Sequence, residues 1–299
     1  MLRLLCALAL VGALLAAGCG GGSDAKKAPA LPLITIGTKN FTEQYILGEL
    51  YAQTLRKAGF RVDLKSNIGS SEIIDKALTA GSLDMYPEYT GVLLSEIAGD
   101  RSRPPSAAKT YAAARAFEQK RGFTLLAATP FSDSNALVVL PRFAKKWHLS
   151  SIADLKRVPR LRLGALPEFA ARFEGSMGLR SVYGLTNFRF FPLQVTDRYH
   201  TLDDGKVNVL AVFTTEGQLS AGSYVVLRDP LKLFAYQNLA PVIRRDLVRR
   251  YGGRLTAPLD RLTRRLTTDV MRRMNAAVDL RRQKPAAVAA RFLTNGSIG

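Results

Sequence analysis

Two short runs in the first third of the chain hold residues that could bind a small charged ligand. Residues 37–44 read Gly-Thr-Lys-Asn-Phe-Thr-Glu-Gln and place Lys39 between an apolar stretch and an expected helix start. Residues 86–91 read Tyr-Pro-Glu-Tyr-Thr-Gly and place Tyr89 at the end of a second apolar stretch. A lysine can pair with a carboxylate, and a tyrosine ring attracts a cation to its face. Together the runs indicate a lysine and aromatic faces that converge on one small ligand.

The residue patterns of an enzyme are missing from the sequence. His148 and His200 are the only histidines, and neither stands in a zinc spacing or beside a nucleophile motif. The only cysteines, Cys6 and Cys19, lie in the N-terminal segment, so we expect neither a disulfide nor a cysteine metal site in the mature fold. We therefore expect a binding protein that has no catalytic residues, no cofactor and no metal.

Short apolar runs alternate with helical patterns along the chain, which predicts an α/β fold with largely parallel sheets. Asn40 with Glu43 three residues later has the pattern of a capping box for the helix that follows. A single helix is expected over 169–183, and the pattern is helical from about residue 244 onward. In open α/β sheets, ligands bind at the carboxyl ends of strands, where Lys39 is expected.

These runs resemble the glycine betaine/choline (osmoprotectant) substrate-binding proteins of ABC importers, and the resemblance extends from about residue 34 to the C-terminus. It implies a two-lobed periplasmic-binding-protein fold of type II, in which the chain crosses twice between lobes. When the lobe boundaries of the family are transferred to this sequence, lobe one comprises residues 32–133 and 234–299, and lobe two comprises residues 134–233. A quaternary ammonium group has no N–H to donate, so aromatic faces hold it best, while arginine or lysine holds a carboxylate.

The resemblance also implies the residues of the site. Lys39 and Arg172, the latter in Glu-Phe-Ala-Ala-Arg, stand where the family binds the ligand carboxylate. The positions of the aromatic cage are occupied here by Tyr89, Asn135, Phe213 and Tyr236. Further candidates are Tyr86, Thr90, Asp133 and Thr215.

Three departures limit what the resemblance says about the ligand. Asn135 takes the place of a cage tyrosine, which removes one aromatic wall and adds an amide. Phe213 keeps the ring of another tyrosine but loses its hydroxyl, and Val92 replaces a small polar residue that contributes to carboxylate binding. Loss of one aromatic face would cost about 1–2 kcal/mol for a desolvated cation.

The first residues read as an export signal. Arg3 precedes the apolar stretch 4–17, and the run Leu-Ala-Ala-Gly-Cys at 15–19 has the pattern of a lipoprotein cleavage site with Cys19 as the lipidated residue. We thus expect a signal peptide at 1–18, a flexible linker at 19–31 and a protein anchored by lipid to the outer face of the cytoplasmic membrane.

The chain carries a net charge of +19, and loss of residues 1–18 would lower it only to +18. The export signal argues against nucleic acid as the partner, and we expect a solvated basic surface near an anionic membrane or wall. The expected function is that of a monomeric receptor that delivers a quaternary-ammonium or zwitterionic solute to an ABC permease. A receptor for a more polar solute, such as an amino acid or ectoine, and a basic envelope protein that binds polyanions are the alternatives.

Overall fold

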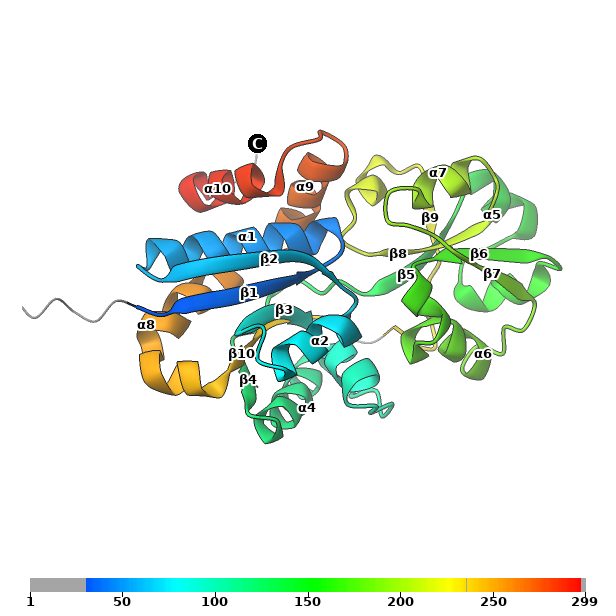
Figure 1. Ribbon diagram of the computed structural model, residues 1–299. Helices are drawn as coiled ribbons and strands as arrows, with labels where there is room; N and C mark the ends of the chain where they lie inside the picture. Colours follow the sequence, from blue (N-terminus) through cyan, green and yellow to red (C-terminus); the bar gives the residue numbers. More distant parts are fainter. Residues whose placement is uncertain (1–30, 235, 297–299) are drawn as a thin grey trace, which may run out of the picture. The chain divides into compact units, whose positions relative to one another are not determined.

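The computed structural model describes residues 31–234 and 236–296. The predicted signal peptide, Cys19 and nearly all of the predicted linker lie outside this part of the chain. The described chain contains two five-stranded sheets, each covered by helices (Figure 1). We call the first sheet with its helices lobe one and the second sheet with its helices lobe two. The strands of lobe one fall within 33–125 and 239–244, and those of lobe two within 135–226. The residue boundaries given above for the lobes stay predictions.

The sheet of lobe one has the strand order β2-β1-β3-β10-β4. Its strands are β1 (Leu33–Lys39), β2 (Arg61–Gly69), β3 (Met85–Tyr89), β4 (Phe123–Leu125) and β10 (Leu239–Arg244). Strands β1, β2 and β3 are parallel, so their carboxyl ends meet at one edge of the sheet. Strand β10 runs antiparallel to both of its neighbours, because it returns to this sheet from lobe two.

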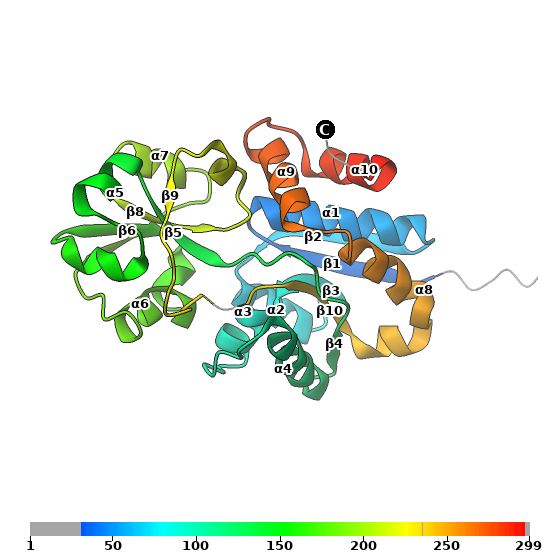
Figure 2. The same ribbon diagram turned by 180° about the vertical axis from the view of Figure 1, so that it is seen from behind.

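Helices cover both faces of this sheet (Figures 1 and 2). Helices α1 (Thr42–Lys57), α8 (Arg245–Thr263), α9 (Thr268–Asp279) and α10 (Pro285–Asn295) build one core with it. Helices α2 (Ser71–Thr79), α3 (Thr90–Val92), η1 (Leu93–Ile97) and α4 (Ala107–Lys120) lie on the other face. Helix α8 bends at Gly252, whose φ of 50° and ψ of −136° are not helical.

The sheet of lobe two has the order β7-β6-β8-β5-β9. Its strands are β5 (Asn135–Val139), β6 (Leu161–Ala165), β7 (Phe188–Pro192), β8 (Val209–Phe213) and β9 (Val225–Val226). Its helical segments are α5 (Pro141–Trp147), η2 (Ile152–Arg157), η3 (Pro167–Ala170), η4 (Phe173–Met177), α6 (Gly178–Ser181), α7 (Arg198–Asp203) and η5 (Gly217–Ala221).

Three details differ from the sequence-based expectations. Both sheets are mixed, because β5 and β10, which follow the two crossings, run antiparallel to their neighbours. The helix expected over 169–183 is broken, because Arg172 is extended and Glu174 and Gly175 have non-helical dihedral angles. A Cβ on Gly175 would lie 2.2 Å from the Phe169 carbonyl oxygen, so this conformation requires glycine. The predicted capping box is wrong: Phe41 caps α1 without a side-chain bond, and the Glu43 carboxylate binds other partners.

The chain passes between the two sheets near residues 131–135 and again near 233–239. The two passages lie side by side, joined by an antiparallel bridge between Ser132 and Asn238 and by a bond from Asp133 N–H to the Gln237 carbonyl (3.0 Å). Paired segments of this kind can bend together, so the fold permits the lobes to move as two bodies.

Candidate ligand site

The candidate site lies where the carboxyl ends of the strands of both lobes face one another. Lys39 and Tyr89 end β1 and β3, while Asn135 begins β5 and pairs in register with Phe213, which ends β8. A small cavity of about 30 Å³ lies among these side chains. Its lining consists of Lys39, Asn40, Phe41, Ser70, Ser71, Tyr89, Val92, Asp133, Asn135, Glu168, Arg172, Phe213 and Gln237.

Most of the predicted site residues therefore come together. Lys39, Tyr89, Asn135, Arg172, Phe213 and Asp133 all line this cavity. Tyr236 does not: it is 37 % exposed, and its hydroxyl donates to the Pro105 carbonyl at 3.2 Å, while the adjacent Gln237 lines the cavity instead. Tyr86 and Thr90 are fully buried away from the cavity, Tyr86 in an apolar cluster of lobe one. Thr215 lines a neighbouring chamber.

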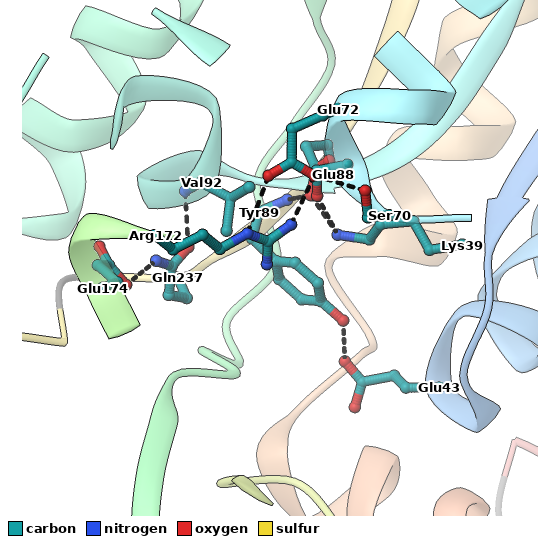
Figure 3. A network of polar contacts seen from close by, with 11 residues as sticks. Lys39, Glu43, Ser70, Glu72, Glu88, Tyr89, Val92, Arg172, Glu174 and Gln237 are labelled. Atoms are coloured by element: carbon teal, nitrogen blue, oxygen red, sulfur yellow. Dashed lines mark hydrogen bonds and ion pairs between the residues drawn. The ribbon is translucent and has the colours of Figure 1, made fainter. Parts of the chain in front are cut away.

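The Lys39 ammonium lies over aromatic rings and beside a carboxylate. Its Nζ is 4.3 Å from the centre of the Tyr89 ring and 5.7 Å from that of Phe41. It also pairs with Glu88 Oε1 at 2.5 Å and donates to Ser71 Oγ at 3.1 Å (Figure 3). Burial lowers the pKa of Lys39, and the charge of Glu88 opposes that shift. The rings thus already face a cation, which the protein itself supplies.

Three rings from both lobes form one stack along the site. Phe41 lies nearly parallel to Phe213, with ring centres 5.0 Å apart, and to Tyr89, with centres 6.4 Å apart. Phe41 was not among the residues singled out from the sequence, although it follows Lys39 by two positions. Its ring supplies an aromatic face beside Tyr89 and Phe213, in a site where Asn135 replaces a tyrosine.

Asn135 does not present a free amide to the cavity. Its Nδ2 donates to the Glu174 carbonyl oxygen at 3.1 Å, within its own lobe. Gln237 is held similarly, with Nε2 donating to Glu174 Oε2 at 2.6 Å and Oε1 accepting from the Val92 N–H at 3.0 Å. Gly91 permits this packing, because a Cβ there would lie 2.5 Å from the Gln237 amide nitrogen. Gln237 therefore joins the second crossing to both lobes.

Arg172 reaches from lobe two to lobe one. Its Nε and Nη2 donate to the two oxygens of Glu72 at 3.0 and 2.9 Å, a bidentate ion pair between the lobes (Figure 3). The break in the helix makes this possible, since Arg172 itself is extended, with φ −80° and ψ 148°. Burial alone would raise the pKa of Glu72, but the bonds and charge of Arg172 and the Ser70 hydroxyl lower it to about 2.

A second group of bonds joins the lobes around Glu43. This buried carboxylate accepts from the Tyr89 hydroxyl (2.7 Å), from Asn275 Nδ2 (2.9 Å) and from the Thr215 hydroxyl of lobe two. Asp133 accepts from the Thr215 N–H at 3.0 Å. Burial raises the pKa of both carboxyls. These bonds and the Arg172–Glu72 pair hold the lobes together in the described conformation.

A larger chamber of about 660 Å³ lies on the other side of the Phe41–Phe213 pair and shares Phe41, Asp133 and Phe213 with the small cavity. Arg198 pairs there with Glu216 at 2.8 Å. The small cavity has room for only one or two water molecules. A solute with three methyl groups on nitrogen can enter it only when the lobes or side chains move apart.

The Arg172–Glu72 pair should make the stability depend on pH. The pKa of Glu72 is lowered to about 2 in the folded protein from its ordinary value of 4.5, so the stabilisation by the ion pair is present above about pH 4.5 and is lost as the pH falls toward 2. Glu72→Gln should therefore lower the free energy of unfolding at pH 7 by up to about 1 kcal/mol, since the side chain is 38 % exposed. The deficit should shrink at pH 3, as urea denaturation can measure.

Glu49→Gln is the matched control. The Glu49 carboxylate accepts a hydrogen bond from the neutral Gln53 amide (2.9 Å), so this variant makes the same chemical change without breaking an ion pair. A Glu72→Gln deficit that is as large at pH 3 as at pH 7 would show that the ion pair does not stabilise the described conformation.

Within residues 31–234 and 236–296, none of the helices is both long and apolar enough to span a membrane.

Comparisons with known proteins agree on one family. The model for the substrate binding domain of ABC-type glycine betaine transport systems matches residues 32–295. A glycine-betaine-binding protein of Pseudomonas aeruginosa is 32 % identical over 273 residues, 87 % of this chain and 86 % of that protein.

Two further matches are named for another ligand or for several ligands. An ergothioneine transport permease/ergothioneine binding protein of Helicobacter pylori is 26 % identical over 88 % of this chain, a match that covers 47 % of that protein. A crystal structure described as a glycine betaine/carnitine/choline ABC transporter superposes with a TM-score of 0.70 at 26 % identity, covering 88 % of this chain and 97 % of the other. These matches confirm the type II binding-protein fold, and they confirm a binding protein rather than an enzyme. The chain belongs to the family of substrate-binding domains of ABC-type glycine betaine transport systems.

Proposed function

We propose that this chain captures a small solute with a quaternary ammonium group, of the glycine betaine or choline type, and passes it to an ABC permease. The observation that carries the proposal is the aromatic stack of Tyr89, Phe41 and Phe213, which lies beside Lys39 and Arg172 in a cavity between the lobes. Ring faces suit a cation without N–H groups, and the two basic side chains suit a carboxylate.

The charges of the site refine this proposal. Lys39 is paired with Glu88, and Arg172 is paired with Glu72. A ligand carboxylate must therefore displace a protein carboxylate from one of these partners, and a quaternary ammonium cation must reach ring faces over which the Lys39 ammonium already lies. The Arg172–Glu72 pair is the better candidate for exchange, because it is less buried than the Lys39–Glu88 pair. We expect opening of the lobes to break it.

A thermal-shift screen against glycine betaine, choline, carnitine, ectoine and polar amino acids tests the proposal. A ligand at a hundred times its Kd stabilises the folded state by about 2.7 kcal/mol, which shifts the melting temperature by several degrees. We expect such shifts for betaine or choline. Shifts for amino acids or ectoine alone would favour a receptor for a more polar solute. This experiment therefore decides between a quaternary ammonium ligand and a more polar one.

We also propose that the receptor is monomeric and anchored by lipid at Cys19, with residues 1–18 removed as a signal peptide. The support is the cleavage pattern at 15–19 and the extracytoplasmic role of the family. Cells grown with an alkynyl fatty acid should label the wild-type chain and not Cys19→Ala, which should remain unprocessed or leave the membrane fraction. Absence of label from the wild type would contradict the anchor.

A further inference from the structure

The excess positive charge of the chain is concentrated in its last part and at one end of lobe one. Residues 244–295 contain fourteen Lys and Arg residues against four Asp residues. A subset of six basic residues lies at the end of the sheet opposite the ligand site, and we call it the basal patch. It consists of Lys57, Arg61, Arg245, Arg249, Arg250 and Arg254.

Strand direction places the basal patch away from the ligand site. Lys57 ends α1, and Arg61 begins β2, where it pairs in register with Leu33 at the start of β1. Helix α8 starts at the outgoing end of β10, which lies beside the start of β4. Its Tyr251 packs edge-on against Phe60, with ring centres 5.7 Å apart. Lys39 lies at the other end of β1, about 20 Å away along the strand.

The charges of the patch are available to a partner. All six side chains belong to exposed residues, and within the described part of the chain none of them makes an ion pair within 4.0 Å. The acidic residues nearest in sequence are Asp63 and Asp246, and Asp246 is already paired with Arg244 at 3.0 Å. Because the patch spreads over two helices and a strand and does not surround a pocket, it suits a broad anionic surface more than a small anion.

The chain itself brings such a surface close. Leu31, the first described residue, lies two positions before Leu33, which pairs in register with Arg61. Eleven residues lie between Cys19 and Leu31, so a lipid at Cys19 would hold this end of lobe one within roughly 40 Å of the membrane. This argument for proximity rests on the anchor proposed above, although the charge of the patch does not.

We propose that the basal patch binds the headgroups of anionic phospholipids. Each exposed Lys or Arg near an anionic bilayer strengthens binding by about fivefold, so several together give measurable binding at physiological salt. In this orientation the ligand site, at the opposite end of the strands, faces away from the bilayer and toward the solutes outside. The patch would thus hold the receptor in position for capture between deliveries.

Vesicle flotation tests the proposal with the chain from residue 19, the mature form expected here, carrying Cys19→Ser so that no lipid contributes. Phosphatidylcholine vesicles are compared with vesicles that also contain phosphatidylglycerol. The test variant is Arg245→Glu/Arg249→Glu/Arg254→Glu. The matched control, Lys145→Glu/Lys156→Glu/Arg160→Glu, makes the same charge change at exposed positions of lobe two.

We expect the parent chain to float with the anionic vesicles only, and raised salt to release it. The test variant should lose about 100-fold or more in its partition coefficient, and the control should keep most of its binding. Equal losses in both variants would mean that total charge and not the patch is responsible, and flotation with neither vesicle would exclude lipid binding. Thermal shifts with betaine or choline, measured on the same variants, report separately on the proposed function.

Discussion

Arg172→Ala is expected to weaken the binding of glycine betaine by about 10- to 100-fold and to leave choline binding nearly unchanged. A charge-assisted hydrogen bond to a carboxylate contributes about 1.5–3 kcal/mol when it is shielded from water, and choline has no carboxylate to receive it. Calorimetric titration of the same variant with both solutes isolates that contribution. Arg157→Ala, which removes another guanidinium of lobe two and its ion pair with Asp154 (3.2 Å), serves as the control.

The outcome also separates two roles of Arg172. If the side chain acts only by holding the lobes together through Glu72, both solutes should lose affinity to the same extent. Equal losses would therefore remove Arg172 from the anion side of the site. Glu72→Gln provides an independent comparison, because it frees Arg172 for a ligand and should tighten the binding of betaine more than that of choline.

Tyr89→Ala is expected to weaken the binding of betaine and choline alike by about 5- to 30-fold. The reason is that the contact between a desolvated cation and the ring contributes about 1–2 kcal/mol. Tyr89 is 3 % exposed, so loss of its ring should also lower the free energy of unfolding by about 3–5 kcal/mol. Melting followed by circular dichroism shows whether the variant is folded at the temperature of the titration.

Tyr89→Phe distinguishes the ring from the hydroxyl. It keeps the aromatic face but removes the donor to Glu43 (2.7 Å). We expect the affinity for both solutes to stay within about threefold of the wild type, because the cation contacts the ring face. If the phenylalanine variant loses as much affinity as the alanine variant, the bond to Glu43 is the important contact and the cage interpretation fails.

Much of lobe one could be predicted from local sequence patterns. The strand before Lys39 and the helix after Thr42 appear where apolar periodicity placed them, because each element buries a continuous apolar face. The broken segment around Glu174 could not be predicted this way. Its apolar spacing fits a helix, but Arg172 is extended, Glu174 and Gly175 have non-helical dihedral angles, and Gly175 approaches the Phe169 carbonyl too closely for a Cβ.

The residues of the site also divide into those that local motifs located and those that only contacts distant in sequence reveal. Lys39 and Tyr89 lie in motifs at the ends of expected strands, and Arg172 was located by the resemblance of its motif to the family. Glu43 fitted a capping pattern, but its carboxylate is used by Tyr89, Asn275 and Thr215, which are 46 or more residues away in sequence. Glu72 and Gln237 were missed for a similar reason, since their roles come from contacts between the lobes that no local pattern encodes.

Titration calorimetry on the wild-type chain and on the Arg172→Ala/Tyr89→Ala variant tests the central claim most directly. The account predicts that betaine or choline binds the wild type at one site per chain. It also predicts that the double variant, once shown to be folded by its melting curve, loses that binding. A wild-type chain that binds neither solute, or a folded double variant that binds as tightly as the wild type, would contradict the claim that this cavity receives a quaternary ammonium solute.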